Sequence, residues 1–291
     1  MPGTEASSEE MKELAFAVDR AGEGTLEIVS DWLDQEIEMS WMKEYVEKSD
    51  CGLTVLQTNG DSVKTILYCE EQFLKGKNVR PQFPGRNVGL MFGLESSLHP
   101  FIGHPSYKDI SHLPLNERLS IMRDPAFKQK ILNESPSFRE DLQKAAKEQK
   151  SNKTKEEIKA EAEIGKKLIS NYETQFILSD PPNYEPTRED SIAYLAEQRK
   201  QSEEEVIYDE LIKDDGKSLI YACFTPYENH KLKFVETFYK LKSSVAGGSD
   251  GGAHCGLICD ASMPTTNLSH WARDRSCLLY TSDAADDKCS V

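Results

Sequence analysis

The sequence predicts an α/β fold or barrel built on a parallel sheet. Short apolar segments alternate with longer segments of helical periodicity along residues 25–83. Such an alternation joins parallel strands through right-handed crossovers. The sequence also lacks an apolar run of about 18 residues, so we expect the helices of a globular core and no membrane association.

The first part of the chain carries the regular part of this alternation. Ser7 precedes an apolar-periodic run that ends near Gly22, which predicts a capped helix. The strands expected next are residues 25–30, 53–58 and 79–83. The helices expected between them are residues 36–48 and 62–74.

The pattern becomes irregular after Pro84. Three histidines, His99, His104 and His112, fall in this loop-rich stretch. Metal ligation and loop packing are both possible there, and the intervening prolines favour packing because they keep the imidazoles off one helix face or strand edge. Residues 142–167 are rich in Lys, Glu and Ala, which predicts a solvated helix, with partner binding as the other interpretation.

Regular structure is expected again after a stiff, proline-rich loop at residues 179–186. The later helices are expected at residues 189–199, 203–212 and 233–240. The later strands are expected at residues 218–224 and 243–247, the first of them after a turn at Asp-Asp-Gly 214–216.

Chemistry is expected where the last strand ends. Asp250 follows that strand, and the adjacent Gly251 and Gly252 allow the backbone to approach a ligand closely. In a (β/α) barrel, residues at the carboxyl ends of strands line the active-site mouth. Asp250 can there bind a metal ion or take a proton from metal-bound water, or it can simply hydrogen-bond its own turn. His254 has a similar pair of interpretations, an active-site rim or a structural hydrogen bond.

The charge of the chain excludes one class of partner. Lys and Arg total 35 against 50 Asp and Glu in 291 residues, which gives a formal net charge of -15 and a pI near 5.0. A nucleic-acid binder needs a basic surface to displace phosphate counterions, so no nucleic-acid partner is expected. The acidic start MPGTEASSEE lacks the positive charge and apolar core of a signal peptide, and we expect a cytoplasmic protein.

The carboxyl-terminal residues 277–291 are interpreted as sequencing-adapter read-through and not as native sequence. Residues 277–287 agree codon by codon with the translation of a transposase-type adapter. Without this segment five of the seven cysteines remain, namely Cys51, Cys69, Cys223, Cys255 and Cys259. Five scattered cysteines in a long acidic chain do not suggest a disulfide framework. Cys255 and Cys259 have CxxxC spacing but no second pair to complete a tetrahedral zinc site, so free thiols are predicted.

Several collinear blocks resemble one protein family. The block GSDGGAH at 248–254 continues through ICDASMPT at 258–265 to HWARDR at 270–275. Earlier blocks, in the same order as in that family, are GLMFGL at 89–94, LHPF at 98–101, DPPNYEP at 180–186 and DDG at 214–216. Over about residues 2–275 the chain resembles the N-acyl-D-amino-acid deacylases (D-aminoacylases) of the metal-dependent amidohydrolase superfamily.

The resemblance implies both a fold and a chemistry. The fold is a partial TIM-like (β/α)8 amidohydrolase barrel, roughly strands 5 to 8, over residues 1–276, with a helical insertion near residues 105–215. The family uses zinc to hydrolyse the amide bond of N-acyl-D-amino acids, with a metal-bound water attacking the acyl carbonyl. Asp250 matches the last-strand aspartate that touches the metal and acts as general base, and Gly251, Gly252 and His254 fall in the adjoining active-site loop.

The chain departs from this family at the metal ligands. The family's first barrel strand carries a His-x-His pair, and the present sequence contains none. We therefore expect that the chain is a fragment and that Met1 lies inside the parent gene. The fragment is expected to be inactive, and only the full-length parent is expected to hold Zn²⁺. Its substrate would be a small N-acyl amino acid, and its oligomeric state stays open. The alternative is a non-catalytic acidic interaction module in which Asp250 is structural.

Overall fold

The structure is a computed structural model that describes residues 6–30, 35–57, 63–137, 166, 169–225, 227, 229–248, 256 and 261–276. The chain divides into two compact units. The first unit comprises Met1–Arg86, Leu232–Ser249 and Ala261–Val291, and the second comprises Asn87–Lys231 and Asp250–Asp260. Each unit has its own sheet, so each is described by itself.

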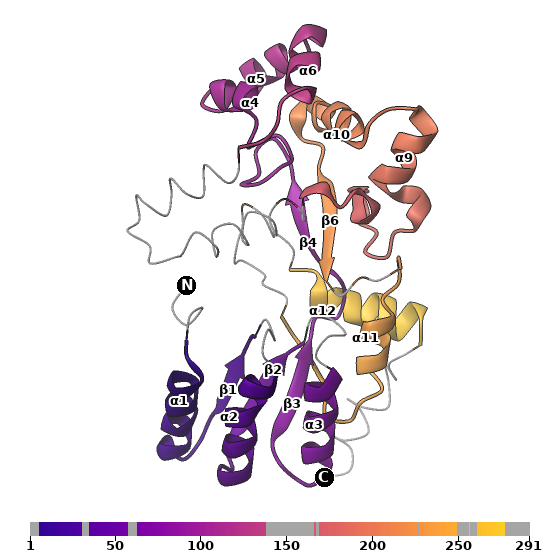
Figure 1. Ribbon diagram of the computed structural model, residues 1–291. Coiled ribbons are helices and arrows are strands. Elements are labelled where there is room, and N and C mark those ends of the chain that lie inside the picture. The colour runs from indigo at the N-terminus through magenta and orange to yellow at the C-terminus, as the bar shows by residue number, and fades with distance from the viewer. Residues whose placement is uncertain are drawn as a thin grey trace. The chain divides into compact units, whose positions relative to one another are not determined.

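A parallel sheet forms the centre of the first unit (Figure 1). Its strands, in spatial order, are β1 (Thr25–Ile28), β2 (Gly52–Leu56), β3 (Val79–Phe83) and β7 (Val245–Ala246). Thr25 lies opposite Gly52, and Gln82 of β3 lies opposite Val245 of β7. The expected α/β class with a parallel sheet is thereby confirmed, and each of these strands overlaps the range that its sequence pattern predicts.

The helices of the first unit follow the predicted order. They are α1 (Ser8–Ala21), α2 (Gln35–Lys48), α3 (Val63–Leu74), α11 (Lys233–Phe238), α12 (Met263–Thr266) and a wide, π-type helix η5 (Asn267–Asp274). The Ser7 hydroxyl accepts a hydrogen bond from the Glu10 backbone N–H at 3.2 Å, and Gly22 ends α1 in the left-handed conformation. The predicted cap of the first helix is thus confirmed.

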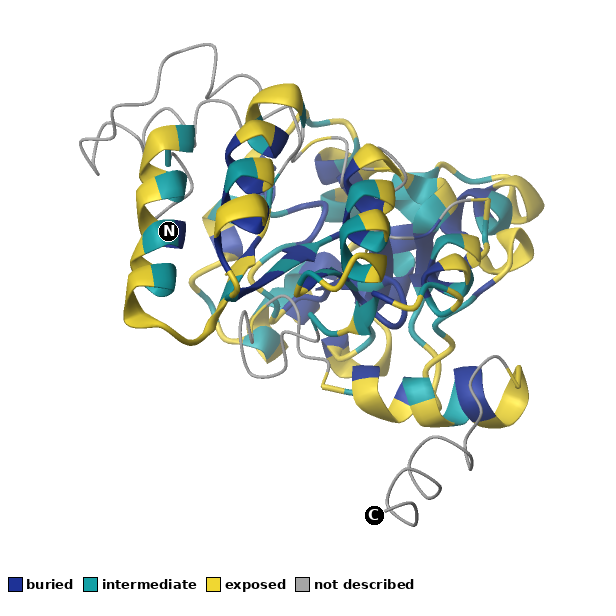
Figure 2. Cartoon of the chain, turned by 90° about the horizontal axis from the view of Figure 1, so that it is seen from below, coloured by how far each residue is buried: buried dark blue, intermediate teal, exposed yellow. Residues whose placement is uncertain are grey.

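The core of the first unit lies between the sheet and its amino-terminal helices. Trp41, Met42 and Tyr45 of α2 pack with Leu53 and Val55 of β2 in one buried cluster. In Figure 2 the helices of this unit show alternating buried and exposed stripes, as expected for amphipathic helices on a sheet. The period of the apolar residues therefore decides which helix face is buried.

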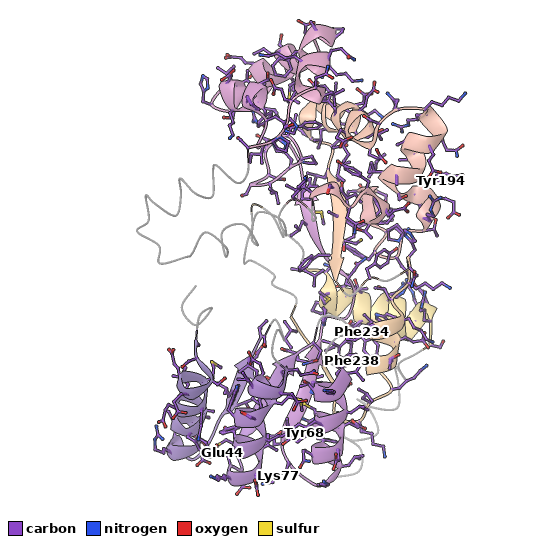
Figure 3. All side chains as sticks on the ribbon, viewed as in Figure 1. Glu44, Tyr68, Lys77, Tyr194, Phe234 and Phe238 are labelled. Carbon is purple, nitrogen blue, oxygen red and sulfur yellow. The ribbon has the colours of Figure 1, made fainter. Side chains whose placement is uncertain are left out.

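Aromatic rings fix α11 and η5 to the end of β3. The rings of Phe234 and Phe238, both labelled on α11 in Figure 3, lie 4.6 Å apart. Phe238 also lies 4.9 Å from Phe83 of β3, and the fully buried Trp271 of η5 lies 5.2 Å from Tyr239. These contacts hold the carboxyl end of β3 in place.

The second unit is built on an antiparallel sheet, which corrects two expectations. Its strands, in spatial order, are β4 (Val88–Phe92), β6 (Ile220–Thr225) and β5 (Gln175–Ile177). Residues 88–92, expected to be irregular, form β4 because β6 supplies their backbone partners. Residues 218–224 contribute a strand as expected, but it does not belong to the parallel sheet.

The helices of the second unit precede and follow β5. They are α4 (Pro105–Ile110), α5 (Leu115–Met122), α6 (Pro125–Leu132), α9 (Ile192–Arg199) and α10 (Glu203–Leu211), with short turns η2 (Tyr172–Thr174), η3 (Arg188–Asp190) and η4 (Asp214–Gly216). The helices expected at 189–199 and 203–212 are confirmed as α9 and α10. Pro105 starts α4, because proline fits the first turn where its missing N–H is not needed, and His99, His104 and His112 all lie outside that helix.

The core of the second unit joins its helices to β4 and β6. Phe101 and Tyr208 are buried with their ring centres 5.3 Å apart, and the Tyr208 hydroxyl donates to the Met122 carbonyl at 2.7 Å. Glu210 is buried and accepts hydrogen bonds from Arg199 and Lys213 at 2.7 and 2.8 Å. A buried carboxylate is thereby compensated by two cations.

Some expectations lie outside the described residues. These are the helix at 142–167, apart from Lys166, and the adapter-like segment 277–291. Among the helices that the structure describes, none is long and apolar enough to cross a membrane.

Candidate functional site

The carboxyl ends of three parallel strands meet at one edge of the first unit's sheet. The Gln57 N–H donates to the Gln82 carbonyl at 2.7 Å, and the Gly247 N–H donates to the Phe83 carbonyl at 2.9 Å. These bonds continue the β2–β3 and β3–β7 ladders past the strands. Ligand sites in open and closed parallel sheets lie at such an edge. We call residues Gln57, Gln82, Arg86, Gly247 and Gly248 the carboxyl edge.

The carboxyl edge holds polar side chains that are withdrawn from water. Gln57 is 0 % exposed and Arg86 is 2 % exposed. The Oε1 atoms of Gln57 and Gln82 are buried and accept no hydrogen bond within the described part of the chain. Because buried polar atoms in folded proteins nearly always have a partner, such atoms at a sheet end are candidates for contact with a ligand.

Gly247 and Gly248 follow β7 directly and lie at this edge. A side chain at Gly247 would collide with the Gln82 amide, and a methyl group at Gly248 would lie 3.3 Å from Leu56 Cδ1. Gly248 also has φ +67, which favours glycine. The last strand can therefore run against Gln82 only with glycine at these positions, and Asp250 follows two residues later.

A turn from β3 positions Arg86, and η5 holds that turn. The Trp271 Nε1–H donates to the Gly85 carbonyl at 2.5 Å. Gly85 has no room for a side chain, because a methyl group there would overlap Asn267, whose Oδ1 accepts from the Tyr239 hydroxyl at 2.6 Å. The HWARDR block thus has a structural role at the carboxyl edge through Trp271.

The carboxylate of Glu70 on α3 anchors the segment that leads into β7. It accepts a hydrogen bond from the Ser243 N–H at 3.1 Å and another from the Ser243 hydroxyl. Burial opposes ionisation of Glu70, but these hydrogen bonds outweigh it and lower the pKa of the carboxyl group. Glu70 therefore stays ionised at neutral pH and fixes the start of the last strand.

The sequence-predicted site residues lie outside the described residues. These are Asp250, Gly251, Gly252 and His254, together with Cys255 and Cys259. Gly248 is the last described residue before them. Gly256 is the one residue described between Gly248 and Ala261, and its carbonyl accepts a hydrogen bond from the Ser97 N–H at 2.7 Å. The continuous description of the chain therefore ends at Gly248 of the carboxyl edge, two residues before Asp250.

The three histidines of the loop-rich stretch lie in the second unit. His99 and His104 are buried, whereas His112 is exposed. The His99 ring packs edge-on against Tyr107 with ring centres 4.4 Å apart, and its Nδ1 accepts from the Phe101 N–H at 3.3 Å. Burial, the Arg118 charge and His104 lower the pKa of His99 to about 3, so the imidazole is neutral at pH 7.

Zinc, which the resemblance implies, does not fit the residues that the structure describes. Within that part of the chain no group of three or more His, Cys, Asp or Glu side chains could hold a metal ion. At the carboxyl edge the side chains are amides and a guanidinium, and a guanidinium has no lone pair for a metal.

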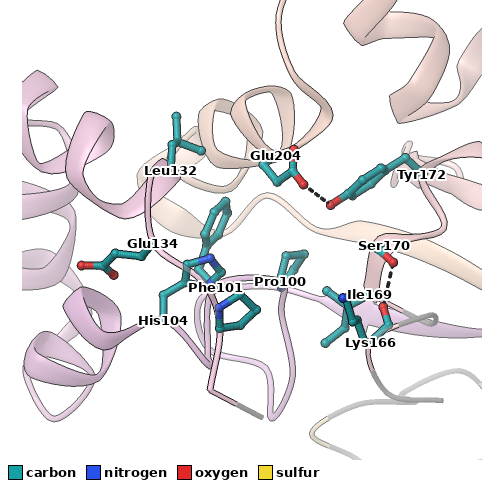
Figure 4. A pocket seen from close by; sticks show the side chains of 11 residues that line it. Pro100, Phe101, His104, Leu132, Glu134, Lys166, Ile169, Ser170, Tyr172 and Glu204 are labelled. Atoms are coloured by element: carbon teal, nitrogen blue, oxygen red, sulfur yellow. Dashed lines mark hydrogen bonds between the residues drawn. The ribbon is translucent and has the colours of Figure 1, made fainter. Parts of the chain in front are cut away.

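A pocket of the second unit is mainly apolar (Figure 4). Its volume is about 180 Å³, and Phe101, Leu132 and Ile169 are among its lining residues. The two carboxylates that line it already accept hydrogen bonds, Glu204 from the Tyr172 hydroxyl at 2.8 Å and Glu134 from the Ser106 N–H at 2.9 Å. With its acids occupied in this way, the pocket offers packing rather than chemistry.

Sequence reasoning missed Gln57, Gln82 and Arg86. The available signal was their place, since each lies at or just beyond the carboxyl end of a predicted strand. Their burial could not be read from the sequence, because Gln and Arg are usually exposed. No protein-family model, curated protein or solved structure matches this chain, so the site is assigned from geometry and from the residues themselves.

Proposed function

We propose that the chain is the carboxyl-terminal part of a metal-dependent amidohydrolase that cleaves the amide bond of N-acyl-D-amino acids. The observation that carries the proposal is the carboxyl edge of a four-stranded parallel sheet, where Gln57 and Arg86 are buried and Gln82 lies against Gly247, three residues before Asp250. In this proposal β1, β2, β3 and β7 are roughly strands 5 to 8 of a barrel.

Asp250 is the general base in this proposal. A carboxylate that follows the last strand is placed at the mouth of a barrel, where it takes the proton of the attacking water and passes it to the leaving amine. Gly251 and Gly252 leave room for the substrate beside it, and His254 lines the rim.

The described residues supply binding groups for the same substrate. An N-acyl amino acid carries one carboxylate and one amide, and the buried Arg86 guanidinium is the matching cation for the carboxylate. Gln82, whose Oε1 has no partner among the described residues, is a hydrogen-bond acceptor for an amide N–H. Arg86 and Gln82 orient the substrate and exclude water in this proposal, and neither residue needs a metal ion to do so.

The metal belongs to the parent protein in this proposal. Zn²⁺ supplies a bound water of lowered pKa and polarises the acyl carbonyl. Since the present chain offers no His-x-His pair and no described ligand cluster, we expect no turnover by the 291-residue chain. A cytoplasmic location is part of the same proposal, and the free thiols of Cys51, Cys69 and Cys223 are consistent with a reducing compartment.

Two measurements test the proposal. The 291-residue chain, assayed with and without added Zn²⁺, should release no amino acid from N-acetyl-D-amino acids. A longer chain recovered from the same locus should contain a His-x-His strand and should hydrolyse these compounds. In that longer chain Asp250→Asn should lower kcat by about 10²- to 10⁴-fold.

Asp50→Asn serves as the matched control. Asp50 precedes β2 at the opposite end from the carboxyl edge, and its side chain is fully exposed. This variant should keep wild-type kcat. Turnover by the 291-residue chain, or wild-type activity of Asp250→Asn in the longer chain, would contradict the proposal and favour the acidic interaction module.

A further inference from the structure

The second unit contains a polar pocket that the proposed function does not use. Its volume is about 380 Å³. The lining residues come from the segment after β4, from α4 and from α5, and they are Leu94, Glu95, Ser96, His99, Tyr107 and Arg118, with Ile102 and Ser111 at the rim. We call this group the polar pocket.

Arg118 is held rigidly in the wall of the polar pocket. Its Nη1 donates to the Leu94 carbonyl at 2.7 Å and to the Tyr107 hydroxyl at 2.6 Å. These two bonds fix the plane of the guanidinium, because Leu94 and Tyr107 are both buried. A ligand that meets Arg118 therefore meets an ordered cation rather than a mobile surface side chain.

The charge of Arg118 is not neutralised by the residues that the structure describes. No described carboxylate lies within ion-pair distance of the guanidinium, and none of those residues accepts a hydrogen bond from its Nη2. A half-buried guanidinium is usually paired with an anion. An anion is therefore the missing partner in this pocket.

His99 adds a neutral donor on the same wall. Its Nδ1 accepts the Phe101 N–H, so the proton of the neutral ring is on Nε2. Within the described residues nothing accepts a hydrogen bond from that Nε2–H. The wall thus offers one positive charge from Arg118 and one uncharged donor from His99.

We propose that the polar pocket binds the carboxylate of a small organic acid, with Arg118 as the cation and His99 Nε2 as a second donor. A single positive charge matches a monoanion, whereas a phosphate dianion would leave one charge uncompensated beside Glu95. Leu94 and Ile102 offer apolar surface for a short aliphatic tail. The polar pocket shares no residue with the carboxyl edge, and this proposal does not depend on the proposed amidohydrolase function.

The test uses sodium butyrate as the probe and the full 291-residue chain. Ligand-observed NMR should show saturable binding of butyrate and none of butyramide, which has the same shape without the charge. Arg118→Gln should weaken butyrate binding about 10- to 100-fold, the range for a lost charge-assisted hydrogen bond. Arg123→Gln is the matched control and should bind as wild type, because Arg123 pairs at the surface with Asp215.

A second pair of variants leaves the packing of the pocket intact. Ser111 is exposed at the rim, so Ser111→Asp should weaken butyrate binding and Ser111→Lys should strengthen it. These variants keep the test informative if Arg118→Gln fails to fold. The absence of saturable butyrate binding, equal binding of butyramide, or tighter binding of inorganic phosphate than of butyrate would overturn the proposal.

Discussion

The two units of this protein are built from contacts of very different range along the chain. In the first unit β1, β2 and β3 follow one another in sequence as well as in space, and each is joined to the next by one helix. In the second unit β4 pairs with β6, and Tyr221 of β6 hydrogen-bonds Asn87 across 134 residues. Local patterns therefore specify most of the first unit, whereas the second depends on long-range pairing.

The units also use polar residues differently. In the first unit polar side chains gather at the carboxyl ends of parallel strands, where Gln57 and Arg86 are buried. In the second unit they compensate one another inside the core, as Glu210 does with Arg199. The buried Oε1 atoms of Gln57 and Gln82, which have no partner among the described residues, indicate a candidate site, whereas a buried ion pair is a structural contact that is costly to break.

The largest expected effect comes from breaking a long-range contact of the first unit, the one between Trp271 of η5 and Gly85. Trp271→Ala removes a fully buried ring and its hydrogen bond to Gly85, and we expect a loss of about 3–5 kcal/mol in the free energy of unfolding. Leu268→Ala, on the same helix but 56 % exposed, should change it by about 0.5 kcal/mol or less. Urea unfolding followed by far-UV circular dichroism measures both, and equal effects would contradict the packing described for η5.

Acid should weaken the second unit through His99. Its pKa is 6.5 in the unfolded chain and about 3 when folded, so folding favours the neutral ring. This contribution is complete above pH 6.5 and is lost as pH falls towards 3, with a slope of up to about 1.4 kcal/mol per pH unit.

The variant His99→Gln isolates this dependence. Subtracting its unfolding free energy from that of the wild type, measured between pH 7 and 4, removes the groups common to both proteins. The difference should fall with decreasing pH. A difference that stays flat would show that His99 is not buried as a neutral ring.

Replacing a carboxylate should distinguish the ion pairs of the two units. Glu210→Gln in the second unit removes a negative charge that is 3 % exposed and one of the two acceptor oxygens for Arg199 and Lys213, at about 1.5–3 kcal/mol. Glu236→Gln in the first unit removes a carboxylate that is 24 % exposed and pairs with the exposed Lys240, and it should leave the melting temperature nearly unchanged. Differential scanning calorimetry compares them, and a larger shift for Glu236→Gln would reverse the comparison.

The smallest expected effects are at two helix caps with the same geometry. Ser7 and Ser202 each accept a backbone hydrogen bond at 3.2 Å, and replacing either by Ala should remove about 1 kcal/mol of helix stability. The readouts should differ. Ser202→Ala should lower global stability because α10 contributes several core residues, whereas Ser7→Ala should mainly speed amide exchange in α1, whose one buried residue is Ala15.

The candidate site shows how far sequence reasoning reaches. The strand at 243–247 was predicted from the sequence, and it contains β7. The glycines that were given a role, Gly251 and Gly252, lie outside the described residues, and the steric demand at Gly247 and Gly248 was not predicted. Gln82 and Arg86 were not predicted. A glutamine or an arginine after a strand is ordinary in sequence, and only the packing of β7 and η5 makes these two residues parts of a candidate site.

The sequence by itself determined the elements whose signals are local. Strand 79–83 was predicted residue for residue, α1 begins after its predicted serine cap, and α10 begins at residue 203 as its apolar periodicity predicts, because caps and periodicity act within one or two turns. Only the tertiary structure decided that residues 88–92 form β4 and that β6 is antiparallel. The physical reason is that a strand's hydrogen bonds are made with another segment, and for β4 that segment lies more than a hundred residues away.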